Sequence, residues 1–224
     1  PGVITENSVY YYSWQKTVTA TLYVYNNSAS TKTGTAYLNY AGSITNASIG
    51  LGTTSLSGYT FRGWSTSTAG NASITVAANK AASINKDTTY YASYSYTITA
   101  TYYYYNGSSY TSSKPTATAY MNYVGTKIGA KPTTPTVKNP SGWTGRGWST
   151  SSSATGTVAT PGTITGNATY YYSWQKTVTA TLYTYNNKSS AKTGTAYLDY
   201  KGATTKATIG LGTTSLSGYS FRGW

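Results

Sequence analysis

The chain has 224 residues, of which 27 are tyrosine and none is histidine or cysteine. The absence of histidine and cysteine removes the usual general bases, thiol nucleophiles and soft metal ligands, so we expect no enzyme activity, metal site or cofactor. The net charge of +13 comes from 16 basic and three acidic residues that form no basic run, which makes nucleic acid an unexpected partner and leaves weak attraction to anionic polymers.

A period of 80 residues organises the chain. The segments 10–23 and 170–183 share the sequence YYYSWQKTVTATLY, segment 90–103 is a looser copy, and residues 1–64 match 161–224 at 49 of 64 positions. Self-similarity at a fixed period marks an array of modules. We therefore divide the chain into residues 1–16, the closing strand of a preceding repeat; 17–96, repeat 1; 97–176, a divergent repeat 2 with a proline-rich loop; and 177–224, a repeat 3 truncated before its last strand.

The first predicted strand of each repeat begins at Thr17, Thr97 and Thr177. In repeat 1, apolar side chains alternate with threonine and tyrosine, which is typical of a strand with one buried face; the apolar set is Val18, Ala20, Leu22 and Val24. Asn26-Asn27 and Asn106-Gly107 then predict turns, because asparagine and glycine tolerate positive φ. A second strand follows at 35–40, 118–123 and 195–200, and prolines in the next loop of repeat 2 exclude a central strand there.

The third predicted strand carries a motif of glycine and aromatic residues around an arginine. It reads GYTFRGW at 58–64, GWTGRGW at 142–148 and GYSFRGW at 218–224. We interpret its glycines and rings as structural: Gly58, Tyr59, Phe61, Gly63, Trp64, Gly142, Trp143, Gly147, Trp148, Gly218, Tyr219, Phe221, Gly223 and Trp224. Because the larger Trp143 accompanies the loss of Phe61 at Gly145, we expect one pocket repacked at similar volume. The arginines, Arg62, Arg146 and Arg222, are either cation–π partners of the nearby tryptophan or surface contacts.

The end of each repeat is rich in small residues. Residues 76–83, VAANKAAS, form the only segment that could make a helix, and a short one. The closing strand, at 89–94 in repeat 1, runs into the next repeat almost without a linker. We therefore expect a mainly β protein of small modules in an elongated rod, with at most one short helix per module and no membrane span.

The order of these segments resembles the Listeria–Bacteroides repeat of internalin B-repeats and other bacterial surface proteins. The family's Gly-Tyr-x-Phe-x-Gly-Trp motif matches residues 58–64 and 218–224; in repeat 2, Trp143 and Gly145 depart from it. Its closing motif matches Tyr90, Tyr91, Ala92 and Tyr94, and again Tyr170, Tyr171 and Trp174, where Tyr172 departs. The resemblance implies a small β-grasp-like module, exposed on the cell surface and repeated in tandem.

Three functions follow as expectations. The first is a structural or adhesive stalk of a bacterial extracellular protein or fibre, whose partners are its own neighbouring repeats and, through self-association, filaments. The second is a module that binds anionic glycans or cell-wall polymers with tyrosine- and threonine-rich basic faces. The third is a phage or virion fibre. None of the acids Glu6, Asp87 and Asp199 recurs in the other repeats, so no paired-carboxylate site recurs, and one of the two aspartates could at most support a single isopeptide bond.

Overall fold

The computed structural model describes residues 2–224 and is mainly β, as predicted, with 51% of residues in strands and 3% in helix. The strands are β1 (Ser13–Val24), β2 (Ser28–Asn39), β3 (Ile44–Thr45), β4 (Ala47–Gly50), β5 (Thr60–Ser65), β6 (Val76–Ala77), β7 (Ala81–Ile84), β8 (Thr88–Tyr105), β9 (Tyr110–Ser113), β10 (Thr116–Met121), β11 (Lys127–Ile128), β12 (Thr144–Ser149), β13 (Ala168–Thr184), β14 (Lys188–Leu198) and β15 (Thr204–Thr205). Two 3-10 turns, η1 (Tyr25–Asn27) and η2 (Tyr185–Asn187), complete the elements of this described part.

The chain forms two compact units whose limits differ from the repeat limits in sequence. Unit 1 contains the chain up to Thr97 together with Thr118–Ala130, and unit 2 contains Ile98–Ala117 together with Lys131–Trp224. Most of β10 and all of β11 therefore belong to unit 1, although in sequence they are the second strand and following loop of repeat 2. Strand β8 is unbroken from Thr88 to Tyr105, so the closing strand of repeat 1 and the opening strand of repeat 2 are one element.

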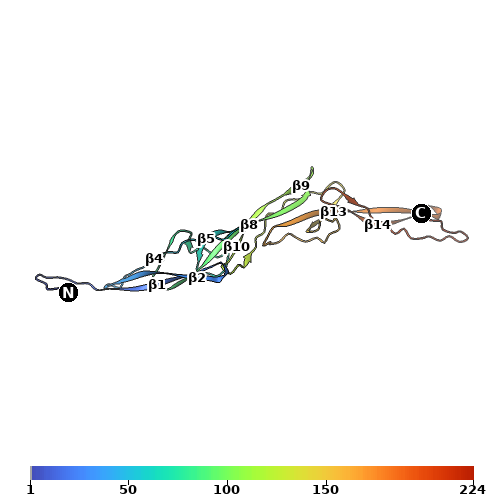
Figure 1. Ribbon diagram of the computed structural model, residues 1–224. Coiled ribbons are helices and arrows are strands. Elements are labelled where there is room, and N and C mark those ends of the chain that lie inside the picture. The colour runs from blue at the N-terminus through green and yellow to red at the C-terminus, as the bar shows by residue number, and fades with distance from the viewer. Residues whose placement is uncertain (1) are drawn as a thin grey trace. The chain divides into compact units, whose positions relative to one another are not determined.

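In unit 1, β1 and β2 form a long antiparallel hairpin, paired from Ser13–Asn39 to Val24–Ser28 (Figure 1). The hairpin turns at Asn26 and Asn27, whose φ angles of 62° and 58° are of the left-handed kind that asparagine accepts. Strand β8 pairs in parallel with β1, and β5 pairs antiparallel with β8 on residues 91–95. Strands β4 and β7 form a separate two-stranded sheet.

The predicted helix at 76–83 is wrong. The segment forms β6, which pairs with β5, and the start of β7, which pairs with β4. Its alanines fit either state, and burial decides between them: Val76, Ala82 and Ile84 enter the core from strands. Tertiary packing overrides the weak helix propensity of so short a segment.

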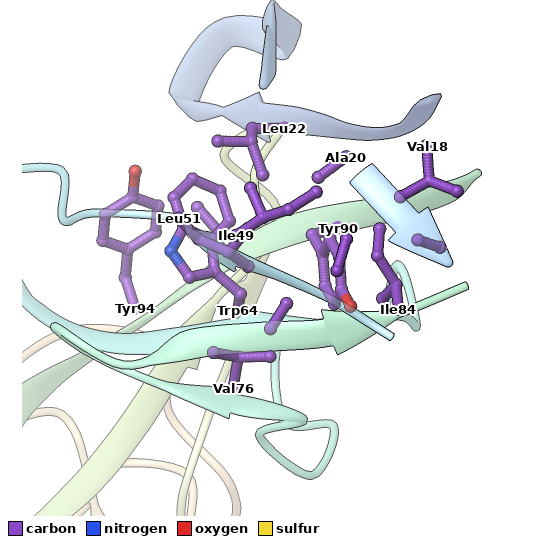
Figure 2. Close-up of a cluster of buried hydrophobic side chains, with 14 of the residues drawn as sticks. Val18, Ala20, Leu22, Ile49, Leu51, Trp64, Val76, Ile84, Tyr90 and Tyr94 are labelled. Carbon is purple, nitrogen blue, oxygen red and sulfur yellow. The ribbon is translucent and has the colours of Figure 1, made fainter. Parts of the chain in front are cut away.

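The core of unit 1 is one cluster of apolar side chains from β1, β2, β4, β5, β6, β7 and β8. Figure 2 shows the Trp64 ring among them, with Tyr94 on one side and Tyr90 on the other. The predicted alternation of β1 is confirmed for Val18, Ala20 and Leu22, which are buried, whereas Val24 at the end of the strand is only half-buried. Met121 of β10 also belongs to this cluster and is 2% exposed, so the core of repeat 1 includes a residue that repeat 2 supplies in sequence.

Unit 2 repeats these pairings with more aromatic residues. Strand β13 pairs antiparallel with β14 along Trp174–Thr184, antiparallel with β12 over residues 171–175, and in parallel with β8 over residues 100–103. Its core cluster contains Ala100, Tyr102 and Trp148, with Tyr170 and Tyr172 packed against it. Leu198 of β14, the counterpart of Met121, is 4% exposed, so repeat 3 contributes to the unit that holds repeat 2.

The predicted third strand at 218–224 is wrong for the last repeat. These residues form no strand, and only the bridge between Leu216 and Tyr219 is made. The reason lies in the partner: β5 pairs with β8 and β12 pairs with β13, whereas no strand that the structure describes pairs with 220–224. A lone strand leaves its backbone groups without cross-strand partners.

Candidate functional site

The arginine of the third strand is held by backbone oxygens and a serine. In unit 1, Arg62 donates hydrogen bonds to the carbonyl oxygens of Gly70 (3.1 Å) and Ala72 (3.3 Å) and to the Ser93 hydroxyl (2.9 Å). Its guanidinium also lies 4.5 Å from the centre of the Tyr120 ring on β10. All three hydrogen-bond distances are measured from one guanidinium nitrogen, Nη1, while the planar group as a whole lies over the ring, a combination that an ammonium group does not offer.

The same arrangement recurs in unit 2. Arg146 donates to the Ala154 carbonyl oxygen and to the Ser173 hydroxyl (3.2 Å), and its guanidinium lies 5.0 Å from the centre of the Tyr197 ring. Both arginines are partly buried, whereas Arg222 of the last repeat is exposed. The rings that face Arg62 and Arg146 are tyrosines supplied by the next repeat, and not the tryptophans of the motif itself.

A β-bulge places the arginine. The pairing of β5 with β8 shifts between Phe61 and Gly63, and that of β12 with β13 shifts between Gly145 and Gly147. Gly63 has φ of 137°, and a Cβ on it would lie 2.6 Å from the carbonyl oxygen of Val76, so only glycine fits. Bulges redirect neighbouring side chains, which explains why glycine follows arginine in the motif.

The other motif residues build the unit cores and the turns at the strand ends. Trp64 is buried and donates from Nε1 to the Gly52 carbonyl oxygen at 2.9 Å, and Trp148 is buried in unit 2. Trp224 makes the bond corresponding to that of Trp64, to Gly212, but is 47% exposed. Gly58, Gly142 and Gly218, the first residues of the three motifs, have positive φ, as does Gly223. Tyr59 contacts Tyr96, and the centre of the Trp143 ring lies 4.6 Å from the Lys176 ammonium. Tyr219 and Phe221 are exposed.

Three tyrosines meet in each unit where the opening strand and the closing strand converge with the turn after the second strand of the next repeat. In unit 1, Tyr23 lies 5.5 Å from Tyr91 and 5.9 Å from Tyr123, and Tyr91 lies 4.7 Å from Tyr123, between ring centres. We call this the tyrosine triad. In unit 2 the triad is Tyr103, Tyr171 and Tyr200, with separations of 5.3, 5.3 and 4.7 Å. Each such pair contributes about 0.5–1.5 kcal/mol beyond burial.

An oxygen of an Asp or Asn side chain fixes the parallel pairing next to the triad. The amide of Thr19 donates to Asp87 Oδ1 at 2.7 Å, and the amide of Thr99 donates to Asn167 Oδ1 at 2.9 Å. Asp87 and Asn167 are counterparts in the repeat, so an amide oxygen serves as well as a carboxylate here. The other aspartate, Asp199, accepts from the amides of Lys201 and Ala203 in a turn.

The electrostatics of the site come from burial of phenols. Burial raises the pKa of Tyr90 and Tyr172, and burial together with the nearby Tyr102 raises the pKa of Tyr170. A hydrogen bond with Tyr200 raises the pKa of Lys201, whose ammonium lies 5.3 Å from the Tyr200 ring centre. Within residues 2–224, no group of three or more His, Cys, Asp or Glu side chains could hold a metal ion, and no helix of this part is long and apolar enough to cross a membrane.

Comparisons with protein-family models, with curated proteins and with solved structures found no match. Both units share one feature on which a function can be argued, the joint between repeats. It consists of the arginine, the tyrosine triad and the core residue from the next repeat. Sequence reasoning identified the arginines but missed their ring partners, Tyr120 and Tyr197. The signal was present, because both tyrosines lie in the recurring TAY segment of the second strand.

Proposed function

We propose that this chain is a structural repeat region of a bacterial extracellular surface protein or fibre, which acts as a stalk between a distal binding part and the cell. The observation that carries the proposal is that repeat 2 supplies Met121 to the core of repeat 1 and Tyr120 to Arg62. A module completed by its neighbour resists bending and opening at the junction, which is what a spacer requires.

The unbroken strand β8 supports the same proposal. A junction made of one continuous strand has no flexible linker, and flexible linkers are what allow tandem domains to reorient. The resemblance to the Listeria–Bacteroides repeat adds the expectation of tandem β-grasp-like modules on a cell surface. A virion fibre would call for the same construction, and the physical argument for a spacer applies to it equally.

A second candidate function has one specific observation in its favour. On unit 2, Tyr103, Tyr110, Tyr200 and Lys201 border an open recess of about 500 Å3 together with Thr111 and Ser112. Tyr110 is exposed and the other two rings are half-buried, and rings beside a cation and hydroxyl groups can stack on a sugar ring and bind an acidic substituent. This surface is the candidate for binding an anionic glycan or a cell-wall polymer.

A glycan array probed with the 224-residue protein separates the two functions. The stalk proposal expects no binding above background. Binding of acidic glycans that is lost in Tyr200→Ala and weakened by salt would favour the second function. The matched control is Tyr40→Ala, because Tyr40 is the counterpart of Tyr200 in repeat 1 and does not border this recess.

A further inference from the structure

The first hairpin of unit 1 exposes a surface whose counterparts are buried. Trp14 is 55% exposed, whereas its counterparts Tyr94 and Trp174 are both 0% exposed. Leu38 is 37% exposed, whereas its counterparts Met121 and Leu198 are 2% and 4% exposed. A recess of about 160 Å3 lies here, lined by Trp14, Gln15, Lys16, Ala36, Tyr37, Leu38 and Ile44. We call this surface, together with Tyr12, the N-terminal face.

One backbone edge of the N-terminal face is also unpaired. Residues 13–16 pair with β2 on one side, and among the strands that the structure describes none pairs with them on the other. In unit 2 the corresponding edge, residues 171–175 of β13, is occupied by β12. Because residues 10–16 and 170–176 have the same sequence, YYYSWQK, both edges offer the same backbone and side chains to a strand.

The corresponding edges of β8 in unit 1 and β13 in unit 2 pair with strands of different sequence, β5 and β12. The sizes of two facing side chains, one on each strand, explain the difference. In unit 1 the strand β5 carries Phe61, whose ring lies 6.0 Å from that of Tyr94, and the neighbouring closing-strand residue is the small Ala92. In unit 2 the size order is reversed, with Gly145 on β12 and Tyr172 on β13. A Cβ on Gly145 would lie 2.5 Å from the Tyr172 hydroxyl oxygen, so any side chain at this position forces the Tyr172 ring to move.

The N-terminal face is of the second type, because Tyr12 is the counterpart of Tyr172. We propose that it is a docking surface for an antiparallel β-strand of the glycine type, with the sequence Gly-Trp-Thr-Gly-Arg-Gly-Trp of residues 142–148, and that Tyr12 rejects the phenylalanine type of residues 58–64 and 218–224. In the docked state the strand's glycine lies beside Tyr12, its arginine lies over Tyr37 and bonds Ser13, and its tryptophan packs against the Tyr12 ring, as Trp148 packs 5.1 Å from Tyr172 in unit 2. These are the contacts that Gly145, Arg146 and Trp148 make or border in unit 2.

Two nine-residue peptides test the proposal directly. The glycine-type peptide has the sequence of residues 142–150, GWTGRGWST, and the phenylalanine-type peptide has that of residues 58–66, GYTFRGWST; both carry one arginine. Each is titrated into the isotope-labelled protein to about 1 mM, the range of weak specific binding, while the Trp14 indole and the amides of residues 11–16 are followed by NMR. We expect the glycine-type peptide to shift these signals. The affinity of the phenylalanine-type peptide should be lower by a factor of about ten or more, because overpacking by one ring is costly.

The variant Tyr12→Ala supplies the matched control. Tyr12 is 77% exposed, so its removal leaves the fold intact. The variant should bind the phenylalanine-type peptide better than the natural protein does, and so reduce or reverse the preference. Equal binding of the two peptides to the natural protein, shifts confined to another surface, or no shift at about 1 mM would each overturn the proposal.

The same size rule is tested within the chain by a double-mutant cycle in unit 2. Gly145→Phe alone should shift the unfolding equilibrium of unit 2 at least about tenfold toward the unfolded state, because its ring meets Tyr172. Adding Tyr172→Ala recreates the pair found in unit 1 and should recover most of that loss. If the double variant loses as much stability as the sum of the losses in the two single variants, the side chains at positions 145 and 172 are not energetically coupled. The proposed selectivity of Tyr12 would then be wrong.

Discussion

Met121 offers the sharpest test of how the repeats complete one another. Replacing Met121 with alanine removes three heavy atoms from a side chain that is 2% exposed in the core of unit 1. Their lost transfer free energy is about 2 kcal/mol, and the cavity left behind raises the expected loss to about 3 kcal/mol, roughly 100-fold in the unfolding equilibrium. Leu38→Ala is the matched control, because Leu38 occupies the same place in the repeat but is 37% exposed; we expect a loss of about 1 kcal/mol or less.

Native-state hydrogen exchange locates the effect, since two units need not unfold together. In Met121→Ala the amides of β5 and of residues 91–95 should lose protection, although the substitution lies in repeat 2. The amides of β12 and of residues 171–175 should be nearly unchanged. If the loss instead falls on unit 2, or if Leu38→Ala costs as much as Met121→Ala, the reasoning that β10 belongs to the core of unit 1 is wrong.

Three further predictions concern the joint. Arg62→Lys should destabilise unit 1 by about 1–2 kcal/mol in urea unfolding, because the lysine ammonium is one bond closer to the backbone than Nη1 and has no planar group to lie over the Tyr120 ring. Arg222→Lys, at an exposed side chain, should change stability by less than about 0.5 kcal/mol, and equal effects of the two substitutions would refute the role of Arg62. Asp87→Asn should be within about 0.5 kcal/mol of the natural protein and Asp87→Ala about 1 kcal/mol less stable, because Asn167 makes the same bond in unit 2; a large loss in Asp87→Asn would mean that the charge matters. Burial raises the pKa of Tyr90, Tyr170 and Tyr172 above 10.0, so at high pH the folded state keeps protons that the unfolded state loses. The urea midpoint should therefore be constant below about pH 9 and fall as the pH rises above about 10, and it should fall less steeply in Tyr172→Phe. A midpoint that rises above about pH 10 would contradict the burial of these phenols.

The strands with a clean local pattern could be predicted from sequence, and their partners could not. Alternation of Val18, Ala20 and Leu22 predicts both the strand and its buried face, because both follow from a period of two. The same pattern places Ala36, Leu38 and Tyr40 on one face, yet only Ala36 is buried. Burial at these positions depends on whether another module covers them, which no local pattern encodes.

The exchange of sizes in repeat 2 shows a second limit. Sequence comparison paired the loss of Phe61 with the gain of Trp143, because the two changes are close in the chain. In the structure Trp143 contacts Lys176, at 4.6 Å from the ring centre, and the ring beside Gly145 is Tyr172, nearly thirty residues away. The change from Ala92 to Tyr172 was visible in the sequence, but only the register of β12 with β13 connects it to Gly145.

The arginine site was half predictable for the same reason. The recurrence of Arg62 and Arg146 beside tryptophan indicates a cation–π contact, and the tyrosines that make it come from the second strand of the following repeat. The short helix expected at 76–83 failed differently, because alanine-rich segments of this length have too little intrinsic preference to resist pairing with β4 and β5.

Small-angle X-ray scattering of the 224-residue chain, and of a chain lengthened by one further 160-residue period, tests the spacer proposal most directly. A compact globule of 224 residues would have a radius of gyration of about 17 Å and would grow only as the 0.38 power of its length. The stalk proposal predicts a radius well above that value and a maximum dimension that increases by the same amount with each added period. A radius near 17 Å with the slow growth of a globule would contradict it.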